Sequence, residues 1–522
     1  MRRLARNGWL IIKIGFTLYL LNQCTGIQKE LSNKATPYDY ATNTGPSYLR
    51  AHMKDGTLFH FEKWFVKDTM KIIQGKGVHY DQNRRQIETS PDSVFNVALS
   101  DVALFETNVV RKGAGSLPVF AALTMVPTAI VTIICITDPK ACFGSCPTFY
   151  AWDGTKMKLM AEGFSASIAK VFEESDIDML CQAKITGKEF TLRLTNEALE
   201  SHAVKFADLL AVPRSNAERV FATPGGEFFI TSSICKPSSC MAPEGDCLEK
   251  VMDMDRIERY SAADPDNLLK KETLEVTFKD PPTGEIGLII GSRQTFLTTF
   301  LFYQGMAHAG SKMPYYMAEV ERGNKKMQGH LTKIWDMLGP IEIFVQNISG
   351  KWIKAGEIDE MGPIAADLRL LKLPFNSRDE VKVRLRMTKG LWRIDQLGLV
   401  PTGRPVEPVL LHPSKVIKDS LEDNYSLRQL LDTAGYLVTM PGDVYDLVYE
   451  LPGTSSDYEL FLFSRGYYME WMREQWLAEE DQYKMAMMFV FPRHYLKIVA
   501  PEFKKIEPEI EEMFWNSRYV KN

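Results

Sequence analysis

Short segments of alternating polar and apolar residues, separated by turn signals, recur along most of this chain. Clear examples are LFHFEKWFV at residues 58–66, KEFTLRLTNEAL at 188–199, TLEVTFKD at 273–280 and EVKVRLRMT at 380–388. A period of two places successive side chains on opposite faces of a strand. With 522 residues, 45% of them hydrophobic, the chain can bury several packed cores. The sequence therefore predicts a mainly β protein with some helices, an α+β fold.

The strand patterns and apolar runs divide the chain into eight segments, in keeping with two to four domains for this length. We predict a signal or lipid-anchor segment at 1–24, a polar tether at 25–47, a small β-barrel at 48–115, an apolar helix at 116–138, a cysteine-containing β domain at 139–285, a helical insert at 286–338, part of a β-sandwich at 339–405, and C-terminal strands and helices at 406–522.

The N-terminus has the pattern of an export signal. Three arginines precede an apolar run from Trp9 to Leu21, and Cys24 follows. Leu21 lies three residues before Cys24, the spacing that a bacterial lipoprotein signal uses, so we predict a lipid on Cys24. Gln23 and Lys13 depart from that pattern, which leaves an uncleaved anchor or an ordinary signal peptide as alternatives. The run is thirteen residues long, which is short for a membrane span of about 20 residues.

A second apolar run, Leu117–Thr137, carries no charge over 21 residues and is long enough to cross a bilayer. Two interpretations stay open: a membrane span, or an apolar helix packed between neighbouring domains. A span after a cleaved signal would return residues from 140 onward to the cytoplasm.

Cysteines cluster in loops rich in Gly, Pro and Ser, which in an exported protein is typical of disulfides. We predict the pairs Cys142–Cys146 and Cys240–Cys247. Unpaired structural thiols and zinc ligands are the alternatives, although neither cluster has the usual C-x-x-C spacing.

No motif predicts a catalytic residue, a metal ligand or a cofactor. The eight histidines are dispersed without H-E-x-x-H, and no serine stands in a G-x-S-x-G frame. Acidic pairs such as Asp176 and Asp178 are more typical of solvated surfaces than of a catalytic dyad. A net charge of −4 with interspersed signs gives no basic face for nucleic acid.

Aromatic side chains are the best indication of binding. Clustered rings can stack on a sugar or a peptide while their polar edges stay hydrated. Alternate aromatics in strands are also typical of a core, and that interpretation stays open. The candidate binding aromatics are Tyr150, Trp152, Trp352, Trp392, Tyr467, Tyr468 and Trp471.

Several stretches resemble uncharacterised secreted or lipoprotein-like proteins of Bacteroidota and related bacteria. They are DPKACFGSCPTFYAWDG, in which SCPxxYxWDG is the characteristic part, AEGFSAS, MGPIAADLRLLKLPF, VKVRLRMTKGLWRIDQLGLV and SRGYYMEW. The resemblance spans about residues 138 to 470. It implies an extracytoplasmic β-rich protein and no particular reaction.

Together these features predict a non-enzymatic envelope protein, anchored in a membrane by its N-terminus and facing the periplasm or the cell surface. Its expected partners are the membrane and a protein or glycan, with no nucleic acid. One alternative is an extracytoplasmic hydrolase acting on glycans, which two carboxylates facing each other across a deep cleft would favour. Another is a bitopic inner-membrane protein, which depends on Leu117–Thr137.

Overall fold

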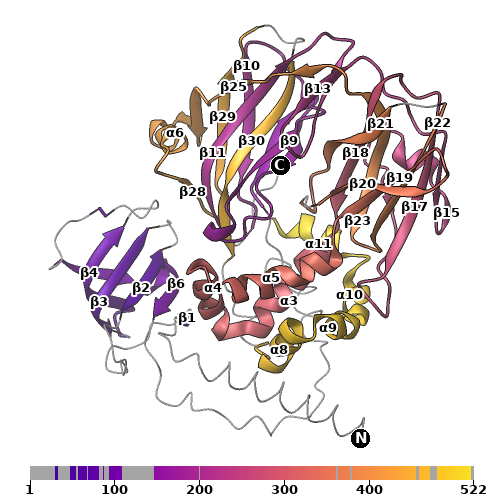
Figure 1. Cartoon of the computed structure of the whole chain (residues 1–522). Coiled ribbons are helices and arrows are strands. Elements are labelled where there is room, and N and C mark those ends of the chain that lie inside the picture. Colours follow the sequence, from indigo (N-terminus) through magenta and orange to yellow (C-terminus); the bar gives the residue numbers. More distant parts are fainter. Residues whose placement is uncertain are drawn as a thin grey trace, which may run out of the picture. The chain divides into compact units, whose positions relative to one another are not determined.

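A computed structural model of the chain describes residues 30–32, 48–107 and 146–518, with gaps at 54–56, 68, 81–85, 88–92, 199, 360–361, 377–378, 454–457 and 471–478. The chain divides into two compact units (Figure 1). The smaller is Met1–Thr124 with Ser311–Ala318, and the larger is Met125–Gly310 with Glu319–Asn522. Strands dominate the described residues, which confirms the predicted mainly β class.

The smaller unit contains one antiparallel sheet of short strands. Its buried centre includes Leu49, Phe61, Trp64, Ile73 and Phe105, which alternate with more exposed neighbours along their strands. The strands are β1 (Glu30–Ser32), β2 (Leu49–Met53), β3 (Leu58–Lys67), β4 (Ile72–Tyr80), β5 (Val94–Ala98) and β6 (Val102–Thr107).

This sheet corrects the predicted N-terminal barrel. Its strand order is β1-β6-β2-β3-β4-β5, and no pairing among the described residues joins the outer strands β1 and β5. A barrel needs hydrogen bonds between its first and last strands, with matching tilt and stagger. Alternation along a strand determines which side chains share a face, but it carries no information about pairing at the edges.

The described strands of the larger unit form four further sheets. The first follows the order β27 (Leu421–Glu422), β26 (Lys415–Lys418), β29 (Val444–Glu450), β10 (Glu189–Thr195), β7 (Thr148–Trp152) and β8 (Met157–Glu162). The second follows β25 (Val409–Leu411), β11 (Glu200–Pro213), β30 (Tyr458–Glu470) and β9 (Glu174–Met179), with β28 (Leu437–Thr439) also paired to β11.

The third sheet follows β16 (Arg259–Tyr260), β23 (Trp392–Pro401), β18 (Glu285–Gln294), β21 (Asp367–Asn376), β12 (Arg219–Ala222), β13 (Phe228–Thr231) and β24 (Pro405–Val406). The fourth follows β15 (Gly245–Asp246), β14 (Ser239–Ala242), β17 (Lys271–Lys279), β22 (Glu380–Thr388), β19 (Ile341–Gln346) and β20 (Trp352–Ile358). These sheets combine strands from segments that the sequence separates at residues 285 and 405.

The middle two sheets are buried on both faces. Along β11, Leu209 faces the core shared with the first sheet, whereas Leu210 faces the core shared with the third. Along β18, Ile289 faces that same intermediate core, whereas Leu288 and Ile290 face the core shared with the fourth sheet. Strands covered on both sides favour apolar residues at successive positions, which explains the continuous runs LLAV at 209–212 and IGLII at 286–290.

Helices pack at one end of the third and fourth sheets. The core that these helices share with the two sheets includes the helical side chains Phe300, Ile334, Met488 and Phe503. The segment predicted as a helical insert, 286–338, starts within strand β18, and its first described helix, α3, begins at Leu297. These helices are α3 (Leu297–Ala309), α5 (Lys325–Leu338), α8 (Gln482–Val490), α9 (Pro492–Ile498), α10 (Ala500–Ile506) and α11 (Ile510–Ser517). Helix α6 (Asn424–Leu431) instead joins the core of the first and second sheets through Leu430. Most of α4 (Met313–Glu321) belongs to the smaller unit.

Several predicted features lie outside the described residues. They are Cys24 with the rest of 1–24, most of the tether at 25–47, and the apolar run Leu117–Thr137. Within the part of the chain that the structure describes, none of the helices combines the length and apolar character that a membrane crossing requires.

Candidate functional site

A cavity of about 380 Å³ opens in the larger unit where strand ends meet helices. Glu200 begins β11 and Glu470 ends β30, while Trp392 begins β23. Helices α3 and α5 contribute Tyr303 and Trp335. This volume lies in the usual range for sites that bind small molecules, about 300–1,000 Å³.

Aromatic rings form much of the apolar wall: Phe302, Tyr303, Trp335, Trp392 and Tyr468 line the cavity. Trp392 is 1% exposed, and its indole Nε1 finds no hydrogen-bond acceptor in the described structure. A buried donor without a partner costs free energy unless a ligand or water accepts its hydrogen bond.

Among the described residues that line the cavity, every charged side chain is acidic. Five carboxylates line the cavity, and no Lys, Arg or His stands among the described lining side chains. They are Glu174, Glu200, Asp336, Asp359 and Glu470. The cavity therefore disfavours anionic ligands, because a buried like charge is costly.

Two of these carboxylates are direct neighbours. Glu200 and Glu470 are opposite each other in the antiparallel pair of β11 and β30. Opposite residues share a face, with Cβ atoms about 4.5–5.5 Å apart. His202 Nε2 lies 2.7 Å from the Glu200 carboxylate, and the Tyr303 hydroxyl donates to Glu470 at 2.8 Å. The two carboxylates stand side by side on one sheet, which differs from a pair facing across a cleft.

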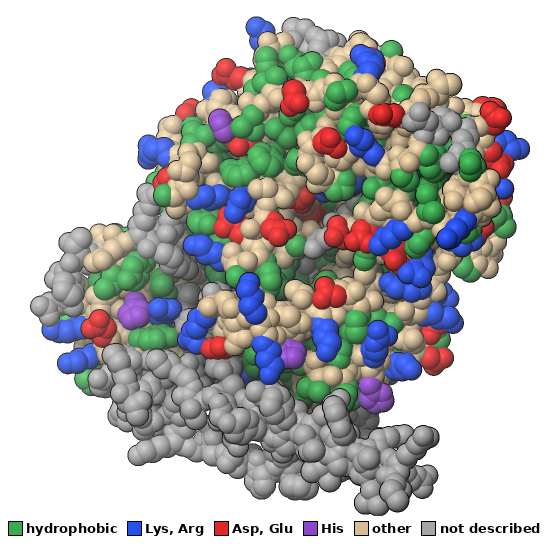
Figure 2. All heavy atoms as spheres, viewed as in Figure 1, with side chains coloured by type: hydrophobic (Ala, Val, Ile, Leu, Met, Phe, Trp, Pro, Cys, Tyr) green, Lys and Arg blue, Asp and Glu red, His purple; other side chains and the backbone are tan. Residues whose placement is uncertain are grey.

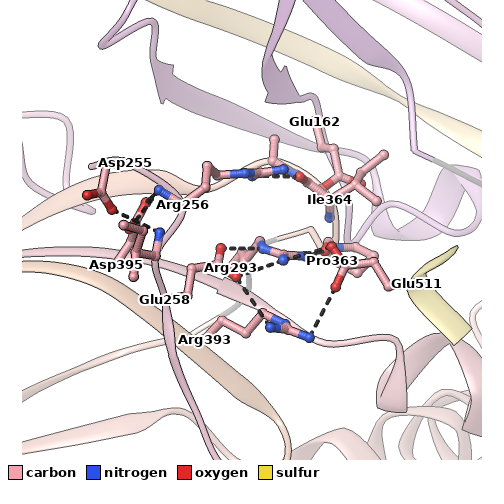
Figure 3. Close-up of polar contacts among 12 residues, drawn as sticks. Glu162, Asp255, Arg256, Glu258, Arg293, Pro363, Ile364, Arg393, Asp395 and Glu511 are labelled. Carbon is pink, nitrogen blue, oxygen red and sulfur yellow. Dashed lines mark hydrogen bonds and ion pairs between the residues drawn. The ribbon is translucent and has the colours of Figure 1, made fainter. Parts of the chain in front are cut away.

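A buried network of charged groups holds the loop that closes one side of the cavity (Figure 3). Gly362 and Pro363 in this loop line the cavity. Arg293 donates to the Pro363 carbonyl at 2.6 Å and pairs with Glu258 at 2.6 and 2.8 Å. Arg293 also contacts Glu511 of α11 at 2.8 Å, so the network connects the third sheet, the loop and the C-terminal helix.

Glu162 secures the next residues of the same loop. One of its carboxylate oxygens accepts hydrogen bonds from the backbone N–H groups of Ile364 and Ala365 at 2.7 and 2.8 Å. Glu162 is 3% exposed, and burial raises its pKa to about 7 despite these two hydrogen bonds and the charges of Arg293 and Arg256. Desolvation therefore outweighs the groups that favour the charged form.

The predicted aromatics do not form one platform. Trp392 and Tyr468 meet at the cavity, whereas Tyr150 is buried and donates to Glu197 at 2.6 Å. Trp152 is 40% exposed on β7. Of the remaining three, Trp352 lies beneath Arg384 on the fourth sheet, Tyr467 packs edge-on against Tyr436, and Trp471 falls outside the described residues.

The predicted cysteine pairs have different outcomes. Cys240 and Cys247 lie side by side with their sulfurs 3.2 Å apart, but they are free thiols in this structure and not the predicted disulfide. Cys142 lies outside the described residues, so its pairing with Cys146, which lines the cavity, stays a prediction. In the described part of the chain, His, Cys, Asp and Glu side chains form no group of three or more that could hold a metal ion.

Sequence reasoning missed Glu200, Tyr303, Trp335 and Glu470. Trp335 lies four residues after Leu331 on a helix, which places both on adjacent turns of one face and could have identified it. Glu200 and Glu470 lie 270 positions apart in the sequence. They become neighbours only through the register of the β11–β30 pair.

No family model and no curated protein matches this chain. Among solved structures, a GH31 alpha-xylosidase from Xanthomonas citri is 7% identical, with a TM-score of 0.14; the match covers 85% of this chain and 38% of the xylosidase. The secreted serine protease VesC from Vibrio cholerae is 8% identical, with a TM-score of 0.15, and the match covers 73% of this chain and 98% of the protease. Similarity this weak carries no argument about fold or function.

Proposed function

We propose that this chain is an exported, membrane-associated protein of the cell envelope that binds a neutral glycan in the cavity without catalysing a reaction. The export signal with Cys24 supports the location, and the cavity supports the binding. Figure 2 shows acidic and basic side chains interspersed over the visible face of the larger unit, so this face has no uniformly basic surface of the kind that binds nucleic acid.

The observation that carries this proposal is the buried, partnerless N–H of Trp392 in a cavity lined by carboxylates. A hydroxyl group is a neutral group that satisfies both, because it accepts from the indole and donates to a carboxylate. A protonated amine could only donate. Sugars present several hydroxyls together with C–H faces that pack on rings such as Tyr468 and Trp335.

Binding can be measured by calorimetry and tryptophan fluorescence with neutral oligosaccharides of glucose, xylose and N-acetylglucosamine. Spermine and an oligogalacturonate serve as cationic and anionic comparisons. We expect at least one neutral oligosaccharide to bind and the galacturonate to fail. The proposal would be overturned if none of the three neutral oligosaccharides bound, or if spermine bound more tightly than all of them.

The Trp392→Phe variant removes the N–H and keeps an aromatic ring. It should weaken binding about tenfold, which corresponds to one hydrogen bond of about 1.4 kcal/mol. Trp352→Phe is the matched control, since Trp352 lies on β20 outside the cavity lining. Thermal unfolding checks that both variants fold. Unchanged affinity in folded Trp392→Phe contradicts the proposed role of the indole.

A hydrolase acting on glycans is the second candidate, because Glu200 and Glu470 place two neighbouring carboxylates in the cavity wall, although side by side on one sheet and not facing each other across a cleft. Retaining glycosidases hold two carboxyl groups only about 5–5.5 Å apart. Release of reducing ends from a bound oligosaccharide, lost in both Glu200→Gln and Glu470→Gln, would establish this activity. Binding without release in the wild-type protein supports the non-enzymatic function.

A further inference from the structure

A small hairpin in the fourth sheet brings two cysteines together, away from the cavity. Strands β14 and β15 pair Met241 with Asp246 and Ala242 with Gly245. The next position along the same register places Cys240 opposite Cys247, and the Cys247 N–H donates to the Cys240 carbonyl at 3.0 Å.

The two thiols have the placement that a disulfide requires. Their sulfurs are 3.2 Å apart, compared with a covalent S–S bond of about 2.05 Å. Residues opposite each other in an antiparallel pair have Cα atoms about 4.5–5.5 Å apart, which lies within the range seen in disulfides. The bond can therefore form by rotating side chains, with little backbone movement.

Charged neighbours fix the hairpin over the core. Arg259, 1% exposed, pairs with Glu244 at the hairpin tip at 2.9 and 3.0 Å and with Glu272 of β17 at 2.7 and 3.0 Å. Cys240 and Cys247 are 0% and 4% exposed, whereas Met241 between them is 51% exposed. Opening of this tip breaks the Arg259–Glu244 pair, in which Glu244 is 48% exposed, and the few hydrogen bonds of β15, which has only two residues.

The two thiols also differ in acidity. A hydrogen bond shared with Cys240 lowers the pKa of Cys247, and the nearby charge of Arg259 acts in the same direction. The same hydrogen bond, together with burial, raises the pKa of Cys240. The thiolate is the nucleophile in thiol–disulfide exchange, and Cys247 is also the more exposed of the two at 4% against 0%, so we assign it as the attacking sulfur.

We propose that Cys240 and Cys247 form a redox-active dithiol that exchanges with small disulfides such as oxidised glutathione. The Cys247 thiolate attacks the disulfide, forms a mixed disulfide and releases one glutathione thiolate, which takes up a proton. The Cys240 thiolate then attacks the Cys247 sulfur and releases the second glutathione. Two protein thiols are oxidised, one glutathione disulfide is reduced, and the hairpin becomes covalently closed. This inference does not depend on the proposed glycan binding.

The test uses the full chain under native conditions. Reduced protein is incubated with oxidised glutathione, alkylated and mapped by mass spectrometry. We expect an intramolecular Cys240–Cys247 bond, while Cys181 and Cys235 remain alkylated as internal comparisons. Absence of that bond, or oxidation at no higher rate than at Cys181 and Cys235, overturns the proposal.

Two variants test the order of attack. Cys240→Ser should accumulate glutathione on Cys247, because the resolving thiol is gone, and Cys247→Ser should leave Cys240 at least tenfold less modified. The reverse pattern contradicts the assignment of Cys247 as the attacking sulfur. Alanine variants replace any serine variant that fails to fold, and reversal of the wild-type bond by reduced glutathione checks exchange independently of both.

Discussion

Arg293 and Glu258 form a bidentate ion pair in which both side chains are only 4% exposed. Removing one partner breaks this bidentate pair and leaves the other buried charge with only a second partner, Glu511 for Arg293 or Arg393 for Glu258. We expect Glu258→Gln or Arg293→Met to lower the free energy of unfolding by about 3–5 kcal/mol. Urea unfolding of the full chain measures this change.

The matched control for this prediction is Arg404→Met. Arg404 also pairs with a glutamate, Glu218, at 2.6 Å, but its side chain is 64% exposed. Loss of this pair should cost about 0–1 kcal/mol. Equal effects of the two arginine variants would show that burial does not set the contribution of the Arg293 pair.

The raised pKa of Glu162 predicts a pH dependence of stability. Its pKa is about 7 in the folded chain, compared with 4.5 ordinarily, so the folded state binds more protons than the unfolded state between these values. Its contribution therefore decreases as the pH rises from about 4.5 to 7, by up to about 1.4 kcal/mol per pH unit. Unfolding free energies measured from pH 5 to 8 should show this slope in the wild type and lose it in Glu162→Gln. The slope should persist in Glu275→Gln, whose side chain is 53% exposed.

The buried His308 should have the opposite effect. Burial lowers its pKa from 6.5 to about 4, and its Nε2 lies 3.0 Å from the Tyr495 hydroxyl. The unfolded chain binds the proton more readily, so this contribution to stability is lost as the pH falls from about 6.5 to 4. His308→Gln should reduce the loss over that range in acid-unfolding curves. An unchanged acid transition would mean that other groups control it.

Two glycines should respond in opposite directions to alanine. A Cβ on Gly77 in β4 would lie 1.9 Å from the His60 carbonyl oxygen, so Gly77→Ala should destabilise the smaller unit by about 1–3 kcal/mol. A Cβ on Gly329 in α5 meets nothing within 4 Å, and Gly329→Ala should stabilise the larger unit by about 0.5–1 kcal/mol. Thermal unfolding followed by circular dichroism distinguishes the two shifts. The Gly77 result fails if its alanine variant unfolds at the wild-type temperature.

The sequence by itself determined the class of fold and many individual strands. The period-two pattern of residues 380–388, for example, predicts a strand with the bounds that β22 has. These features depend on neighbours a few residues apart, which is the range over which alternation and turn propensity act. The Cys240 and Cys247 thiols were brought together for the same reason, since only six residues, including Gly245, separate them along the chain.

The tertiary structure alone decided how the sheets share strands and where the cavity lies. β10 pairs with both β7 and β29, and Glu200 meets Glu470 through the long β11–β30 ladder. Pairing across hundreds of residues depends on which sheet edges and apolar faces remain to be covered once the whole chain is packed, and no local pattern records that choice. Trp392 could be predicted as an aromatic in a strand, but only this packing left its N–H buried without a partner and placed the residue in a cavity that carboxylates also line.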